Sequence, residues 1–406
     1  MLETWTRTPD SVLNRFGSLL ISFRKQNAVN FSSTSLAATF AGRSLRELVV
    51  LCFTCWITFI ILSSGCNSDS TTPPPAEGIG IITLGISPVP RLIPSPTGQD
   101  YIGAINLSNN TGARGQLVSY RWNDLEPSSG VYRFADFSRT LEYLGNGRGF
   151  GILLGLQVVN TNVKETPSDL FAVPFDSLRM KQRFHTLIDS LARYLNPHVH
   201  YLSIGNEVDV YCSIHPDQWS AYKNFYDDAI RYIQSTVPAL RVGVTSTFNG
   251  AIGSEAGHVS ALNSSSDVYI LTYYPLAGNF LVRDPSSPQV DFPEMIRLSG
   301  AKLLILQEVG YPSAQRLGSS EQKQADFVTY TFSAWSATGR QLQFLNFFAL
   351  HDFSEQLCDT LLRYYGVPDT AANFKAYLCS LGLRRADGTP KLSWQAMTDA
   401  ARNYIR

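Results

Sequence analysis

The chain has 406 residues, of which 44% are hydrophobic and 12% aromatic, enough to bury a sizeable core. The 33 basic side chains balance the 33 acidic ones, so no net field attracts the protein to nucleic acid. We therefore expect a folded protein with no nucleic-acid partner.

The first part of the chain predicts targeting rather than a fold. Residues 1–47 are polar and lack periodicity, so they are either unstructured or upstream of the true translation start. Arg43 and Arg46 precede an apolar run over residues 48–62. That run is short for a hydrocarbon core of about 30 Å, which favours a signal peptide over a permanent membrane helix.

Small residues precede Cys66 immediately, and the polar, proline-containing linker 67–78 follows it. Segment 48–66 thus resembles a bacterial lipoprotein signal, although Ser63 stands where that pattern usually has an aliphatic residue. The resemblance implies that Cys66 is lipidated and holds an exported domain, residues 79–406, at the cell envelope, facing the periplasm or the surface. A plain signal anchor with an incidental cysteine is the alternative.

From residue 78 onward, short apolar runs alternate with longer amphipathic segments, which is typical of βα units around a parallel sheet. The predicted strands are 81–85, 117–121, 151–157, 199–204, 241–246, 268–273, 303–307 and 344–350. Most are nearly all apolar, as expected for strands covered on both faces.

Eight such units in about three hundred residues predict an α/β fold of the (β/α)₈ TIM-barrel type. An open doubly wound sheet is the alternative. The turn after the first predicted strand lacks the glycine-rich phosphate-binding patterns of that class, and this favours the barrel.

Polar residues follow the predicted strands at the end where barrel enzymes place their sites. They are Arg121, Trp122, Gln157, Asn206, Glu207, Tyr273, Tyr274, Glu308, His351 and Asp352. Glu207 and Glu308 would lie close together on the rim. Two close carboxyl groups cannot both ionise freely, so one becomes a proton donor while the other attacks. We expect Arg121 and Tyr273 to hold the second one ionised and oriented.

The motifs Gly205-Asn206-Glu207 and Gln307-Glu308-Val309-Gly310-Tyr311 resemble clan A glycoside hydrolases, which are retaining (β/α)₈ enzymes. Segments 122–134 and 271–275 resemble the clan after strands 2 and 6. The resemblance implies that Glu207 is the general acid/base, that Glu308 is the nucleophile, and that Asn206 holds the sugar 2-hydroxyl.

Two departures leave the sugar open. Gln157 stands where many members have a histidine, and the end of strand 8 reads Phe347-Phe348-Ala349-Leu350-His351-Asp352 where many have a tryptophan. The expected substrate-binding residues are Asn206, Arg121, Trp122, Gln157, Tyr273 and His351. Trp122 could equally be a core residue.

The sequence therefore predicts a retaining β-glycoside hydrolase, expected to be a monomer that needs no cofactor. No histidine spacing suits a catalytic metal, so we expect none. A glycan-binding surface lipoprotein without catalysis is the alternative from another class. Cys212, Cys358 and Cys379 could form a disulfide in an exported domain, but three cysteines leave one unpaired and the pair undecided.

Overall fold

A computed structural model describes residues 83–195, 197–368 and 371–404. The predicted segments 1–47, 48–66 and 67–78, with Cys66, lie outside these residues. Within the described ranges, no helix is both long enough and apolar enough to cross a membrane.

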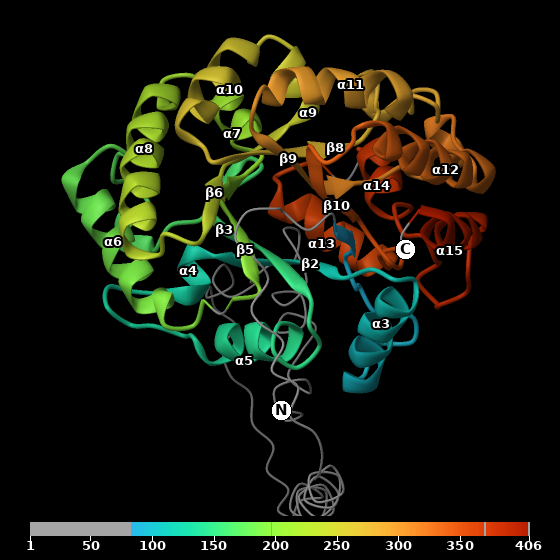
Figure 1. Ribbon diagram of the computed structural model, residues 1–406, viewed down its shortest axis with the longest axis horizontal. Coiled ribbons are helices and arrows are strands. Elements are labelled where there is room, and N and C mark those ends of the chain that lie inside the picture. Colours follow the sequence, from blue (N-terminus) through green and yellow to red (C-terminus); the bar gives the residue numbers. More distant parts are fainter. Residues whose placement is uncertain (1–82, 196, 369–370, 405–406) are drawn as a thin grey trace, which may run out of the picture. The chain divides into compact units, whose positions relative to one another are not determined.

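The strands form a ring of parallel neighbours in the order β6-β5-β3-β2-β1-β10-β9-β8-β7 (Figure 1). Their bounds are β1 (Thr83–Ile86), β2 (Gly115–Arg121), β3 (Gly151–Asn160), β5 (Val199–Asn206), β6 (Arg241–Gly243), β7 (Thr245–Thr247), β8 (Val268–Tyr273), β9 (Leu303–Val309) and β10 (Leu342–Phe347). A short strand, β4 (Val163–Lys164), pairs antiparallel with β3.

The ring closes at one interrupted strand. Strand β6 pairs with β5, β7 pairs with β8, and Val244 alone separates β6 from β7. The two pieces therefore occupy a single strand position. This confirms the predicted TIM barrel, and the open-sheet alternative is wrong.

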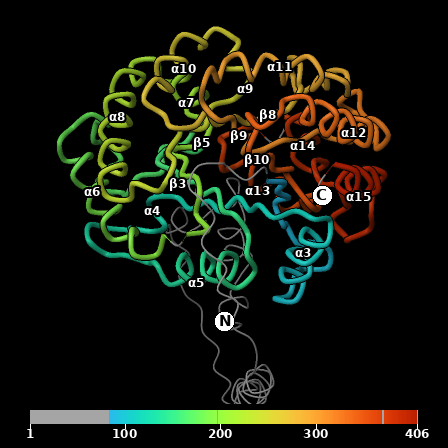
Figure 2. Tube along the Cα trace, in the orientation of Figure 1, coloured from blue at the N-terminus to red at the C-terminus, as the bar shows by residue number. Residues whose placement is uncertain are grey.

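Helices surround the strands (Figures 1 and 2). They are α3 (Gly98–Asn110), α4 (Trp122–Leu125), α5 (Ala135–Leu144), α6 (Leu178–Ala192), α7 (Val208–Ile214), α8 (Gln218–Thr236), α9 (Phe248–Ile252), α10 (Ala256–Leu262), α11 (Pro288–Ser299), α12 (Glu321–Ala337), α13 (Glu355–Tyr364), α14 (Ala372–Leu378) and α15 (Leu392–Tyr404). Helix α6 illustrates why such segments form helices that pack on the sheet. The Ser177 hydroxyl caps its first turn, and one buried stripe consists of Met180, Phe184, Leu187 and Leu191.

The interior of the barrel is apolar at one level and polar at the next. Leu117, Leu153, Tyr201, Ile270, Ile305 and Phe344 form a cluster of their own, separate from the core between strands and helices. Side chains two residues further along a strand face the same way, which brings Ser203 and Gln307 inward above that cluster. The Thr245 hydroxyl lies 2.6 Å from the Ser203 hydroxyl and donates to Gln307 Oε1 at 2.7 Å.

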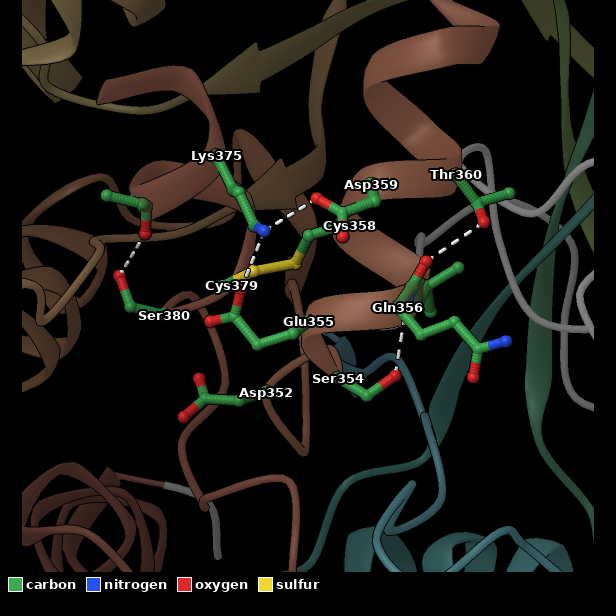
Figure 3. Close-up of a disulfide and its surroundings, with 12 residues drawn as sticks. Asp352, Ser354, Glu355, Gln356, Cys358, Asp359, Thr360, Lys375, Cys379 and Ser380 are labelled. Atoms are coloured by element: carbon green, nitrogen blue, oxygen red, sulfur yellow. Dashed lines mark hydrogen bonds and ion pairs between the residues drawn. A yellow bond between two sulfur atoms is a disulfide. The ribbon is translucent and has the colours of Figure 1, made fainter. Parts of the chain in front are cut away.

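The segment after β10 adds α13 and α14, which a disulfide joins (Figure 3). Cys358 lies on α13 and pairs with Cys379, which follows α14, at a Cα–Cα distance of 6.0 Å. Lys375 on α14 reinforces this link through ion pairs to Asp359 at 2.6 Å and Glu355 at 2.8 Å. The sequence left the pairing open, and of the three cysteines in the described part of the chain Cys212 is free and buried.

Replacing both Cys358 and Cys379 by alanine should lower the free energy of unfolding by about 3 kcal/mol, because the disulfide restricts the unfolded chain over a separation of 21 residues. Denaturant unfolding followed by circular dichroism measures this loss. A reductant should lower wild-type stability to that of the double variant and leave the variant unchanged. Equal stability of the oxidised wild type and the variant would contradict the prediction.

Candidate active site

A cavity of about 460 Å³ lies where strands β5 and β9 end. Asn206 and Glu207 reach it from the end of β5 and Glu308 from β9, so both predicted catalytic carboxylates line one space. Thr161 and Asn162 from the β3–β4 turn and Tyr274 after β8 add polar groups. Sequence reasoning placed these strand ends together because carboxyl ends of barrel strands converge.

Glu207 sits on a sharp backbone turn. Its φ of 49° is left-handed, a conformation that costs a non-glycine residue roughly 1–3 kcal/mol. Gly205 also has a positive φ, and a Cβ there would lie 2.4 Å from the Tyr222 hydroxyl. The surrounding packing therefore enforces the turn that directs the Glu207 side chain into the cavity.

Two threonine hydroxyls hold the Glu207 carboxyl group. Thr272 donates to Oε1 at 2.8 Å and Thr161 donates to Oε2 at 2.9 Å. Burial raises the pKa of Glu207, and the two hydrogen bonds offset that rise in part. Both partners are neutral, so the carboxyl group is positioned without a cation that would hold it ionised.

Glu308 is buried near the end of β9, where the register of the β8–β9 pair shifts. The Tyr274 hydroxyl donates to Glu308 Oε2 at 2.8 Å. Burial and the charge of Glu308 raise the pKa of Tyr274 well above its usual value, so the phenol keeps its proton. The ring of Tyr274 in turn meets that of Tyr377 edge-on, with centroids 5.4 Å apart.

The prediction that Tyr273 contacts the catalytic group is wrong, and the neighbouring tyrosine does so instead. Thr272 faces Glu207, so alternation along the strand turns Tyr273 outward and Tyr274 inward. Tyr273 is fully buried, and its hydroxyl donates to Asp291 at 2.7 Å.

Asn206 is fixed at both ends of its amide. Its Nδ2 donates to Asn160 Oδ1 at 3.0 Å, and its Oδ1 accepts from Gln307 Nε2 at 2.7 Å. Gln307 is itself held by Thr245, as described above. The amide therefore presents one fixed edge to the cavity, which suits its predicted role at a sugar hydroxyl.

Arg121 lies below the rim in a buried polar network. Its guanidinium donates twice to Asp124, each at 2.7 Å, and lies 3.7 Å from Glu165 Oε1. Tyr364 links Glu165 to Asn160, because its hydroxyl donates to the former and accepts from the latter. The role of Arg121 beside a catalytic glutamate stays a prediction.

Gln157 is buried next to this network, with its Nε2 3.4 Å from Asn160 Oδ1. It does not line the cavity, which receives Thr161 and Asn162 from the end of the same strand. A contact between Gln157 and a sugar stays a prediction.

The structure does not place two further predicted substrate-binding residues, Trp122 and His351, in the lining of the cavity. Trp122 is fully buried, donates to Glu126 at 2.9 Å and packs edge-on against Phe184, so it belongs to the core. His351 is buried between the Val89 carbonyl at 2.7 Å and the Arg384 guanidinium at 3.2 Å. Burial lowers its pKa to about 4, so the imidazole is a neutral link between chain segments.

Sequence reasoning missed one wall of the cavity. Its residues come from the segment after β10: Tyr365, Val367, Phe374, Tyr377 and Leu378. The aromatic density of residues 364–377 was the available signal. Asn162 fixes this wall to the β3–β4 turn by donating to the Tyr365 carbonyl at 2.8 Å.

Within the described residues, no three histidine, cysteine, aspartate or glutamate side chains gather where they could hold a metal ion. The predicted independence from a metal or cofactor stays a prediction.

No protein-family model and no curated protein matches the chain. Solved structures match the chain in fold. The exo-β-1,4-mannosidase of Opitutaceae bacterium strain TAV5 is 17% identical, with a TM-score of 0.62 over 84% of this chain and 62% of its own. A GH5_18 protein of Streptomyces cattleya in complex with GlcNAc is 15% identical, with a TM-score of 0.62 over 80% of this chain and 81% of its own.

A GH5_18 protein of Bifidobacterium longum subsp. longum in complex with Manβ1-4GlcNAc is 17% identical, with a TM-score of 0.60 over 80% of this chain and 78% of its own. At these identities the likeness shows a shared barrel fold.

Replacing Thr272 by valine should raise the pKa of Glu207 further, because the hydroxyl that favours the ionised carboxylate is lost while burial remains. The titration of glutamate side chains labelled with carbon-13 measures this shift by NMR. Thr186→Val is the matched control, since Thr186 is exposed and bonds only within α6. A Glu207 pKa that stays unchanged or falls in Thr272→Val would contradict the assignment.

Proposed function

We propose that the chain is a retaining β-glycoside hydrolase of clan A that works through Glu207 and Glu308. One observation carries the proposal: the two carboxyl groups come from the ends of β5 and β9 and line the same cavity. The retaining mechanism needs such a pair at about 5–5.5 Å. The barrel shared with GH5 structures supports the proposal.

The surroundings of the two glutamates divide the roles. The raised pKa of Glu207 suits a general acid that protonates the glycosidic oxygen and later deprotonates water. Glu308, oriented by the Tyr274 hydroxyl, attacks the anomeric carbon and forms the covalent glycosyl-enzyme. Water then displaces Glu308 and leaves the anomeric configuration retained.

The cavity walls suit a sugar. The fixed amide of Asn206 can bond a ring hydroxyl beside the nucleophile, while Tyr377 and Phe374 offer aromatic faces to the apolar side of a pyranose. Similar structures include an exo-β-1,4-mannosidase and a complex with Manβ1-4GlcNAc, so β-mannosides are the first substrates to test.

We also propose that the protein is exported and anchored through Cys66. The lipoprotein-like signal around that residue supports the proposal. So does the Cys358–Cys379 disulfide, because disulfides persist in oxidising compartments outside the cytosol. Labelling cells with a radioactive fatty acid tests this: wild type should carry the label, and Cys66→Ala should not.

Glu207→Gln and Glu308→Gln should each lower kcat on β-glycans by about 10³-fold or more, because each removes a group that takes part in bond breaking. A panel of β-glycans and aryl β-glycosides measures this. Azide should restore turnover of an activated aryl glycoside by Glu207→Gln and give a glycosyl azide of retained configuration, since azide needs no general base to attack the glycosyl-enzyme on Glu308. Glu294→Gln on α11, an exposed position, is the control.

Retained turnover by either variant, from an active parent, would contradict the assignment. Binding of glycans by a parent that hydrolyses none of them would instead support the glycan-binding alternative.

Tyr274→Phe should lower kcat about tenfold or more, because it removes the hydroxyl that orients Glu308. Tyr273→Phe is a matched control on the adjacent residue: it should lower the free energy of unfolding by about 1 kcal/mol through the lost bond to Asp291 and keep kcat per folded molecule. Steady-state kinetics with a thermal melt separates the two effects. The reverse pattern would restore the original prediction for Tyr273.

A further inference from the structure

A second hollow of about 420 Å³ adjoins the catalytic cavity. Its lining comes from β4, from the loop before α6, and from the end of α7 with the start of α8. Its lining includes Asn162, Lys164, Phe171, Tyr211, His215 and Gln218. Asn162 lines both spaces, so the two are neighbours.

Helix α7 separates the two spaces and lines each with a different face. Val210 and Ile214, four residues apart, line the catalytic cavity, while Tyr211 and His215, also four apart, line the second hollow. Because α7 starts directly after Glu207, the position of the second hollow is fixed relative to the proposed proton donor. The boundary between the two spaces includes Asn162 and α7.

The border of the second hollow carries exposed apolar side chains that the fold itself does not require. Phe171, which lines the second hollow, is 60% exposed, and Ile214, which lines the neighbouring catalytic cavity, is 56% exposed. Exposed apolar groups that gather beside a cavity mark binding surfaces more often than isolated ones do. The aromatic ring of Phe171 in particular offers a flat face to a ligand.

Polar groups stand close to these apolar ones. Lys164 Nζ, which has three N–H donors, donates to the Val173 carbonyl at 2.7 Å and lies 4.3 Å from the centre of the Phe175 ring. Gln218 Nε2 donates to Asp217 at 2.6 Å, which leaves its amide oxygen to accept. An aromatic face with donors and acceptors around it matches a pyranose, which has an apolar face and an edge of hydroxyls.

We propose that the second hollow binds additional sugar units of an oligosaccharide whose scissile bond lies at Glu207 and Glu308, with Phe171 as the stacking residue. This inference rests on the proposed function and deepens it by giving the substrate a length. The protein should then prefer oligosaccharides long enough to pass Asn162 and reach Phe171. Short glycosides would use the catalytic cavity alone.

The test uses the full chain carrying Glu308→Gln, so that binding is measured without turnover. Isothermal titration calorimetry compares β-1,4-mannohexaose with β-1,4-mannobiose, and then the matching pair of β-1,4-glucose oligomers. In one of the two series the hexasaccharide should bind more tightly than the disaccharide. Adding Phe171→Ala should raise Kd for that hexasaccharide about three- to tenfold, the size of one aromatic contact, and leave the disaccharide unchanged.

Val290→Ala is the matched control, because Val290 on α11 is 73% exposed and lines neither space. It should change neither affinity. His215→Ala should also raise Kd for the hexasaccharide, because His215 lines the other side of the second hollow.

Equal affinity for the hexasaccharide and the disaccharide in both series, or a hexasaccharide Kd that Phe171→Ala does not change, would overturn the inference. An equal loss of both ligands in Phe171→Ala would also overturn it, because it would place Phe171 in the catalytic cavity. The proposed function fails on a separate result, the absence of hydrolysis by the parent enzyme, so the two failures are distinguishable.

Discussion

Burying two carboxyl groups in one cavity is the constraint on which the rest of this structure depends. A buried carboxylate is costly unless it is hydrogen-bonded or paired, and a second one nearby adds repulsion. The protein meets this cost with hydroxyl donors: Thr272 and Thr161 at Glu207, and Tyr274 at Glu308. Thr272 and Tyr274 come from the end of β8 and Thr161 from the β3–β4 turn, so the donors meet only where both of these parts of the barrel are in place.

A buried polar network fixes Asn206, the residue directly before Glu207. It runs from Ser203 through Thr245 and Gln307 to Asn206, and then through Asn160 and Tyr364 to Glu165. A network of this kind specifies one geometry, since breaking any link leaves an unpaired polar group in a low dielectric. The network therefore holds this part of the site in one geometry, as the proposed proton donor and nucleophile require.

Much of the fold could be predicted from the sequence because buried parallel strands have a simple pattern. Apolar runs such as 303–307 predicted the strands. The carboxylates at the ends of two of these runs, Glu207 and Glu308, were the predicted catalytic residues. Side-chain direction at a strand end was harder. Tyr273 and Tyr274 are distinguished only by the inward position of Thr272, and Trp122 turns into the core because it already belongs to α4.

The aromatic wall of the cavity was not predicted for another reason: apart from its aromatic composition, no local sequence pattern marks it. Tyr365 and Tyr377 line the cavity because α13 and α14 fold back over the barrel mouth and a disulfide joins them. His351 was assigned to the site by its place after the last strand, but the chain turns there to pair with Arg384. Such long-range contacts are set by the tertiary structure and leave only a compositional trace in the sequence.

The surroundings of Glu207 suit its proposed role as the proton donor. The donors to Glu207 are neutral hydroxyls, and they offset only part of the rise in pKa that burial causes. A lysine or arginine in the place of Thr272 would position Glu207 equally well but would hold it ionised and remove the proton donor. The proposed acid catalysis therefore depends on neutral hydrogen-bond donors at Glu207. They orient the carboxyl group and still allow it to carry a proton.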